Sequence, residues 1–92
     1  MPSQENAHAM LPKWQSHKVV KAAKIHSVRG DMINLLVPGP NPDSETGIIQ
    51  ARAADKMFAR YMPVPGDYYV VYDDGYASIS PRQAFEEGYH KL

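Results

Sequence analysis

The sequence contains no cysteine, which excludes disulfide bonds and thiolate metal ligands. It has no apolar run close to the ~18 residues that a membrane helix needs, and residues 1–10 lack the apolar centre of a signal peptide. Its formal net charge is zero, whereas a general nucleic-acid-binding protein usually carries a basic surplus. These absences predict a cytoplasmic protein without a membrane partner, and they count against nucleic acid as its partner.

The 92 residues fit a single domain, with a small core and a thin margin of stability. Charge is unevenly distributed along it. Residues 1–30 carry five Lys and Arg against one Glu, whereas residues 65–92 carry two basic and five acidic side chains. The two ends form either two solvated faces or surfaces that attract each other, within one fold or between copies. A homo-oligomer is therefore one possible state.

Residues 1–12 show no periodicity and predict a flexible N-terminal arm, in which Met10 could be an alternative start. A single α+β domain over 13–92 follows. Its first half predicts three strands, over 18–28, 32–37 and 47–51. Although a helix is conceivable at the start of the first segment, its Val-Val and Ile-His-Ser-Val runs favour a strand. A proline-rich loop at 38–46 separates the second strand from the third.

Ala54, Met57, Phe58 and Tyr61 recur at i, i+3, i+4 and i+7, which predicts a helix at 52–61. A second helix is predicted at 81–87. There, Ser80 is a suitable N-cap, Pro81 suits the first helical position, and Gln83 completes a capping box. Gly88 would end that helix.

The segment 67–80 carries the most specific local signal. An Asp-Gly pair at 74–75 lies between two β-rich runs, which predicts a two-residue type I′ turn with a positive φ at both positions. Such a turn places Asp73 opposite Tyr76. Alternation then predicts a core-facing set: Tyr68, Val70, Tyr72, Ala77 and Ile79. The outward set would be Tyr69, Val71, Asp73, Tyr76 and Ser78.

Together these elements predict a small, strongly curved antiparallel sheet of about five strands with two helices. An open SH3-like barrel is one form of such a sheet. On its outward hairpin face Tyr69 and Tyr76 are candidate binding residues, which Trp14 and Lys18 could join. Aromatic side chains on a rigid hairpin suit a protein partner or a stacked base.

A second layer, such as the helix predicted at 52–61, could cover this outward face instead. However, so short a chain is not expected to bury both faces of the hairpin alone. This reasoning favours association with a partner or with a second copy.

No group of residues indicates catalysis, a cofactor or a metal site. The histidines lack the spacing, to one another or to a carboxylate, that zinc sites use: His8, His17, His26 and His90. Turn chemistry explains Asp73 and Asp74, and helix capping explains Ser80. The glycines form no phosphate-binding loop, and the adhesion-like tripeptide at 29–31 fits a turn. The sequence therefore predicts a protein that is not an enzyme and has no cofactor.

The closing block GDYYVVYDDGYASISPRQAFEEGYHKL and the opening KWQSHKVVKAAKI resemble small proteins encoded in tailed phages and prophages. Those proteins carry a KYQSHK-like start and a GDY–hairpin–DGY–SxSPxxAFEEGY ending. The resemblance covers the two ends, about half of the chain, and residues 30–60 show no match to it. It implies a phage origin and a compact α+β fold, without an activity or functional residues.

From the outward aromatic face and this resemblance we expect a phage-encoded accessory protein in the cytoplasm of an infected or lysogenic bacterium. It would bind a host or phage macromolecule, most simply a protein. Two alternatives stay open at this point. One is a structural or assembly protein of the virion, and the other is an oligomer that sequesters a small ligand such as a nucleotide.

Overall fold

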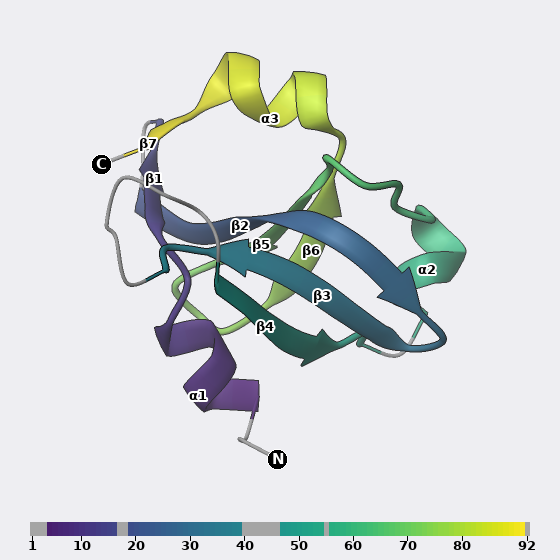
Figure 1. Cartoon of the computed structure of the whole chain (residues 1–92). Coiled ribbons are helices and arrows are strands. Elements are labelled where there is room, and N and C mark those ends of the chain that lie inside the picture. The colour runs from purple at the N-terminus through teal and green to yellow at the C-terminus, as the bar shows by residue number, and fades with distance from the viewer. Residues whose placement is uncertain (1–3, 17–18, 40–46, 55, 92) are drawn as a thin grey trace.

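A computed structural model describes residues 4–16, 19–39, 47–54 and 56–91. The chain has an α+β fold in which a curled antiparallel sheet forms a half-barrel with short helices around it (Figure 1). The helices are α1 (Gln4–Ala9), α2 (Met57–Arg60) and α3 (Arg82–Gly88). The strands are β1 (Lys13–Gln15), β2 (Val19–Arg29), β3 (Met32–Val37), β4 (Gly47–Arg52), β5 (Tyr68–Val71), β6 (Ala77–Ser80) and β7 (His90–Lys91). In the described part of the chain, no helix is long and apolar enough to cross a membrane.

The long strand β2 organises the sheet because it has neighbours on both of its edges. Lys24 pairs with Leu36 of β3 on one edge and with Tyr68 of β5 on the other. Lys21 likewise lies between β1 and β5. Since β4 adds to β3 and β6 adds to β5, the five longer strands lie in the order β4-β3-β2-β5-β6. The predicted curved antiparallel sheet of about five strands is therefore confirmed, and β1 and β7 extend it.

A bulge in β2 explains an irregular apolar pattern in the sequence. The register between β2 and β3 shifts between Ile25 and Ser27, so His26 is the extra residue. Strand residues normally alternate between faces, and a bulge moves the following residues to the opposite face. Val28 consequently packs against the same core as Ile25 despite their odd spacing.

The concave side of the sheet encloses the main core. Its buried members are Leu11, Ala23, Ile25, Ile33, Leu35, Val37, Ala51, Met57, Tyr69 and Val71. The opposite face of β2 and β5 holds a second cluster, in which Phe85 of α3 packs on Val20, Ala22, Tyr68 and Val70. Both faces of β5 are thus buried by the chain itself, with α3 covering one of them. The argument that a partner must cover a hairpin face therefore fails.

The helix predicted at 52–61 is reduced to the single turn of α2. Strand β4 continues to Arg52, and the Ala53 N–H donates to the Asp31 carbonyl at 2.7 Å, which extends the β3–β4 ladder. Pairing with β3 therefore overrides the local helical spacing at its start. Of the four periodic residues, Met57 is buried and Phe58 packs against the core.

The β5–β6 hairpin exists, but its predicted register is wrong by one residue. Val70 pairs with Ser78 and Val71 with Ala77, and the Tyr72 N–H donates to the Tyr76 carbonyl. The loop therefore has three residues, and only Gly75 among them has a positive φ, of 86°. This geometry matches a type I turn with a following left-handed residue, not type I′.

The shifted register changes which side chains share a face. Ala77 and Ile79 lie on the side of Tyr69 and Val71, against the main core. Ser78 shares the other side with Val70. The two predicted sets therefore combined residues from opposite faces. One additional loop residue shifts the pairing by one position, which moves every β6 side chain to the other face relative to β5.

Helix α3 agrees with the prediction of 81–87 to within one residue at each end. Its capping differs, because no side-chain hydrogen bond comes from its own N-cap and Gln83 bonds Glu87 instead of Ser80. The Asp67 carboxylate supplies the cap from a distance by accepting the Arg82 N–H at 2.9 Å.

The N-terminal segment, predicted as a flexible arm, packs on the domain over its described residues. Ala7 in α1 is 3% exposed and Leu11 is 4% exposed, so both side chains are buried in the domain. Helix α1 lies beside β4 (Figure 1). The sequence concealed this packing because two buried residues four positions apart are too few to give a periodic pattern.

A candidate binding cleft between β4 and the β5–β6 hairpin

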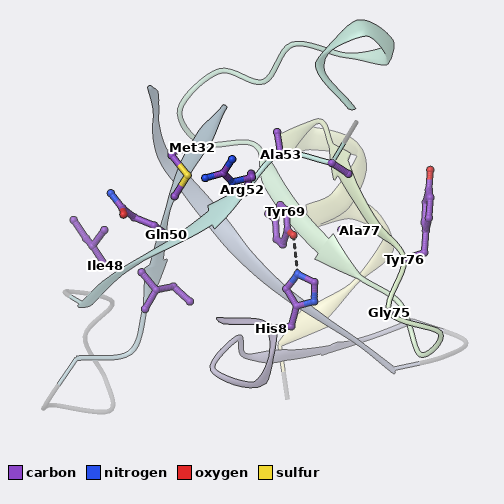
Figure 2. A pocket seen from close by; sticks show the side chains of 12 residues that line it. His8, Met32, Ile48, Gln50, Arg52, Ala53, Tyr69, Gly75, Tyr76 and Ala77 are labelled. Carbon is purple, nitrogen blue, oxygen red and sulfur yellow. Dashed lines mark hydrogen bonds between the residues drawn. The ribbon is translucent and has the colours of Figure 1, made fainter. Parts of the chain in front are cut away.

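An open cleft of about 940 Å³ lies where the half-barrel fails to close, between β4 and the β5–β6 hairpin (Figure 2). Helix α1 contributes one residue to its wall, and the segment after β4 contributes two. We call this site the edge cleft. Its lining consists of His8, Met32, Ile48, Ile49, Gln50, Arg52, Ala53, Ala54, Tyr69, Gly75, Tyr76 and Ala77.

A contact between α1 and β5 lies inside the edge cleft. The His8 Nε2 atom and the Tyr69 hydroxyl are hydrogen-bonded at 2.8 Å, and their ring centroids are 5.7 Å apart. Figure 2 shows these two side chains pointing toward each other. Since Tyr69 is fully buried, this bond satisfies a phenolic group that would otherwise be costly to bury. The contact fixes α1 beside the cleft.

Tyr76 stands at the rim of the edge cleft, on the hairpin. Its side chain is 49% exposed, and Figure 2 shows it projecting from the hairpin away from the Tyr69 contact. The Arg60 guanidinium donates a hydrogen bond to its hydroxyl, and its ring stacks on Tyr72 with centroids 6.1 Å apart. A smaller hollow of about 90 Å³ on the β6 side is also lined by Tyr76 and Arg60. Tyr76 is therefore an exposed aromatic side chain that Arg60 and Tyr72 hold in place between two concave surfaces.

The opposite wall of the edge cleft is a strand edge. Among the described residues β4 pairs with β3 alone, so its other edge has no ladder partner there. The Ala53–Asp31 bond fixes which residues point which way, because antiparallel pairs alternate between bonded and non-bonded. By this alternation, the backbone N–H and C=O groups of Ile48, Gln50 and Arg52 point away from β3. All three residues line the cleft and are exposed.

Charged groups near the cleft are mainly surface groups. Arg52 forms an ion pair with Asp31 at 3.3 Å, and both side chains are about 60% exposed, at 62% and 61%. Such exposed pairs contribute little stability, typically under about 1 kcal/mol. Arg52 therefore lies on the cleft wall beside a carboxylate of opposite charge, in a pair that is not a strong structural support.

The one fully buried carboxylate in the described residues, Asp67, has a structural role away from the cleft. It accepts hydrogen bonds from the Val64 N–H, the Arg82 N–H and the Tyr61 hydroxyl. Burial raises the pKa of the Asp67 carboxyl, but these three donors outweigh burial and hold the pKa below its ordinary value. The same hydrogen bond, together with burial, raises the pKa of Tyr61. A carboxylate whose acceptor sites are occupied this way is suited to holding loops together.

Of the four binding residues predicted from sequence, the three that the structure describes do not form one exposed surface. Tyr76 is exposed at the rim, as predicted, whereas Tyr69 is fully buried and cannot be a surface contact. Trp14 belongs to the second cluster, packed edge-on against Tyr68 and Phe85 at centroid distances of 5.4 and 5.0 Å. Its indole N–H is buried and has no hydrogen-bond partner among the described residues. Lys18 lies outside the described residues.

Sequence reasoning missed most of the edge cleft. His8 was assigned to the arm, Ile48 and Gln50 to a strand without a site, and Arg52 to the start of the predicted helix. The alternation of Ile48, Gln50 and Arg52 with Ile49 and Ala51 was a signal of a half-exposed strand. Nothing in the sequence showed that this strand would lie at an open edge.

No group of three or more potential ligands from His, Asp and Glu lies close enough to hold a metal ion within the described part of the chain. The chain matches no family model, and neither the curated proteins nor the solved structures gave a significant match. The resemblance of its two ends to phage proteins therefore stays a prediction. The geometry of the edge cleft is the basis for assigning a function.

Proposed function

We propose that this is a non-enzymatic, phage-encoded accessory protein that binds a host or phage protein through the edge cleft. The composition of the cleft supports this function. Most of its lining side chains are apolar, and a few polar groups converge on it from different elements, among them His8, Gln50 and Arg52. Binding sites usually combine an apolar surface with a small number of placed polar groups in this way.

The exposed apolar groups at the two walls carry the proposal for a protein partner. Ile48 is 53% exposed on β4, and Tyr76 is 49% exposed on the hairpin. Tyrosine is enriched among the residues that dominate protein–protein binding energy, since it offers a large apolar area with one polar end. The proposal narrows the predicted aromatic hairpin face to Tyr76 and moves the remaining contacts to β4.

Site-specific photo-crosslinking tests this proposal. A benzoylphenylalanine placed at position 76 or at position 48 should capture one and the same protein in infected cells, identified by mass spectrometry. The matched control places it at position 87, where Glu87 is exposed on α3 and outside the cleft. Excess unlabelled protein should compete for the first two adducts. Equal capture from position 87 would contradict the proposal, and presence of the protein in purified particles would favour the alternative of a structural or assembly protein of the virion.

The size of the edge cleft favours one second candidate, the sequestration of a small ligand such as a nucleotide. Its volume of about 940 Å³ falls in the range of small-molecule sites, roughly 300–1,000 Å³. A thermal-shift screen with nucleotides decides between the two. A rise in melting temperature that Tyr76→Ala abolishes would favour the ligand, whereas an unchanged melting temperature with all nucleotides would remove this candidate.

A further inference from the structure

We propose that a second cavity, lined by Lys13 and Lys21, binds a small phosphate ester that also carries hydroxyl groups, such as a sugar phosphate. The cavity has a volume of about 490 Å³ and adjoins the edge cleft, with which it shares His8 and Gly75. We call it the lysine cavity. This inference does not rest on the protein partner proposed above, because neither lysine lines the edge cleft.

The place of the two lysines in the sheet carries the first step of the argument. Lys13 of β1 lies directly opposite Lys21 of β2. The Ala22 N–H donates to the Pro12 carbonyl at 2.8 Å, so the next pair along the ladder is the hydrogen-bonded one. Because bonded and non-bonded pairs alternate, Lys13 and Lys21 form a non-bonded pair, in which Cα atoms are about 4.5 Å apart and side chains lie closest. The fold therefore places two like charges beside each other on one face.

The absence of a neutralising carboxylate carries the second step. Within the described part of the chain, neither Lys13 nor Lys21 forms an ion pair or a side-chain hydrogen bond. Like charges directly opposite each other destabilise a sheet, and an anion between them removes that cost. Lys21 is also half-buried, so water screens it less than a fully exposed lysine. The pair therefore points to an anion that comes from outside the chain.

The charge of the two side chains indicates which anion this is. Each ammonium group has three N–H donors and no acceptor, and lysine binds phosphate as a point charge. A phosphate monoester carries about −1.5 to −2 charges at pH 7, with three acceptor oxygens. Two lysines match that charge, whereas a carboxylate would leave one of them without a counterion. A phosphate is therefore the anion that fits Lys13 and Lys21 best.

Asp73 indicates what else the ligand carries. It follows β5 and lines the same cavity, yet it forms no ion pair with either lysine. An ionised carboxylate only accepts hydrogen bonds, so it repels a phosphate and binds hydroxyl groups, as acidic side chains bind ribose hydroxyls in dinucleotide-binding folds. The cavity volume of about 490 Å³ lies within the range of small-molecule sites, roughly 300–1,000 Å³. A small molecule with a phosphate and hydroxyl groups satisfies all of these residues.

Calorimetric titration of the whole protein tests the proposal, with ribose 5-phosphate, inorganic phosphate and ribose as probes. Ribose 5-phosphate should bind most tightly and ribose most weakly. Lys13→Gln and Lys21→Gln should each weaken ribose 5-phosphate binding by at least about 10-fold, because each removes a hydrogen bond to a charged group. Lys56→Gln is the matched control, since Lys56 is exposed and outside the cavity. It should stay within about 3-fold of the wild type, because a distant surface charge is screened.

Asp73→Ala separates the two parts of the site. Its loss removes a repelling charge for both phosphate probes, but it removes a hydroxyl acceptor for ribose 5-phosphate alone. The ratio of the affinities for ribose 5-phosphate and inorganic phosphate should therefore fall by at least about 5-fold. An unchanged ratio would overturn the assignment of a hydroxyl-bearing ligand.

Thermal melting separates loss of binding from loss of folding. Without ligand, Lys21→Gln should melt no lower than the wild type, because it relieves the repulsion in the pair. Ribose 5-phosphate should raise the melting temperature of the wild type, but not that of Lys21→Gln. A rise that depends on Tyr76 instead of Lys21 would place the ligand in the edge cleft and overturn the lysine cavity as its site.

The comparison of probes on the wild type needs no variant. Equal binding of ribose and ribose 5-phosphate would overturn the proposal, as would no binding of either phosphate at millimolar concentrations. Unchanged affinity in both lysine variants would do the same. A single-stranded oligonucleotide that binds more tightly than ribose 5-phosphate, and loses binding in the same variants, would assign the lysines to a nucleic acid and overturn the small ligand.

Discussion

The Asp67 carboxylate accepts the Arg82 N–H at the first residue of α3, at 2.9 Å across fifteen positions of the chain. This bond joins the loop before β5 to the helix after β6. The N-terminus of α3 is thus capped by a residue from a distant part of the chain. Because α3 covers the second core cluster, the packing of that cluster depends on Asp67.

Replacing Asp67 with Asn should cost about 1.5–3 kcal/mol at pH 7, since a buried charged acceptor is lost. The change should also reduce the fall in the free energy of unfolding as the pH is lowered. The pKa of Asp67 is lowered in the folded protein, so the unfolded chain binds a proton first as the pH falls. Stability from Asp67 is therefore full above its ordinary pKa and is lost as the pH falls through the lowered folded value.

Urea denaturation between pH 2 and pH 7 measures both effects of Asp67→Asn. Glu87→Gln is the matched control, because Glu87 is an exposed carboxylate on α3, the helix that Asp67 caps. If the free energy of unfolding falls equally steeply at acidic pH in Asp67→Asn and in the wild type, Asp67 is not the cause of this pH dependence.

The packing of the N-terminal segment predicts that shortening one of its buried side chains destabilises the protein. Leu11→Ala should lower the free energy of unfolding by about 2–4 kcal/mol, as is usual for a buried leucine. Met10→Ala at the adjacent position should have little effect, because Met10 is 56% exposed. The sequence alone predicts that deleting residues 1–12 costs little, whereas the structure predicts that the deletion is at least as costly as Leu11→Ala. A deletion variant with an unchanged melting temperature would support the flexible arm.

The three-residue turn makes a conformational prediction at Gly75. With φ at 86°, Gly75→Val should cost about 1–2 kcal/mol and Gly75→Asn clearly less. Gly88→Ala provides the comparison, because this glycine lies in α3 and an added Cβ meets nothing within 4 Å. It should leave stability unchanged or raise it. Equal melting temperatures for Gly75→Val and the wild type would be incompatible with this turn.

The two hairpin tyrosines should respond differently to truncation. Tyr76→Ala should change stability by less than about 1 kcal/mol, since its exposed ring contributes little to folding. Tyr69→Ala should cost about 3–5 kcal/mol, because it empties a fully buried aromatic site. Chemical denaturation of the two variants in parallel gives the comparison. A Tyr76→Ala variant as unstable as Tyr69→Ala would remove Tyr76 from the candidate contact surface.

Local chemistry was sufficient to predict the five longer strands and α3, because their signals lie within a few adjacent residues, whereas β1 and β7 were not predicted. The strand predicted at 32–37 has the same bounds as β3. The prediction for β4 differs by one residue at one end, and the prediction for α3 differs by one residue at each end. The hairpin register was not predictable to the same accuracy. The same Asp-Gly pair fits a two-residue and a three-residue loop, and the two loops give opposite face assignments for β6.

The candidate site was largely beyond the sequence because it depends on the sheet's edges. Tyr76 was found, since turn-flanking aromatic residues are conspicuous. His8 and Gln50 were missed, because their importance comes from elements that meet only in three dimensions. The number of chain segments that cover a sheet face cannot be counted from local patterns, and for this reason α3 was not foreseen as the second layer over β5.

The shared strand β2 has a consequence for how the chain is made. Its hairpin with β3 closes through the turn at Gly30, so it can form within about 1–10 μs once both strands exist. The edge that receives β5 must wait for the final third of the polypeptide to leave the ribosome. During that interval Ala22 and Ala23 offer an open ladder in a nascent chain. We expect a product truncated before Tyr68 to be aggregation-prone, because the edge of β2 that normally pairs with β5 then stays unpaired.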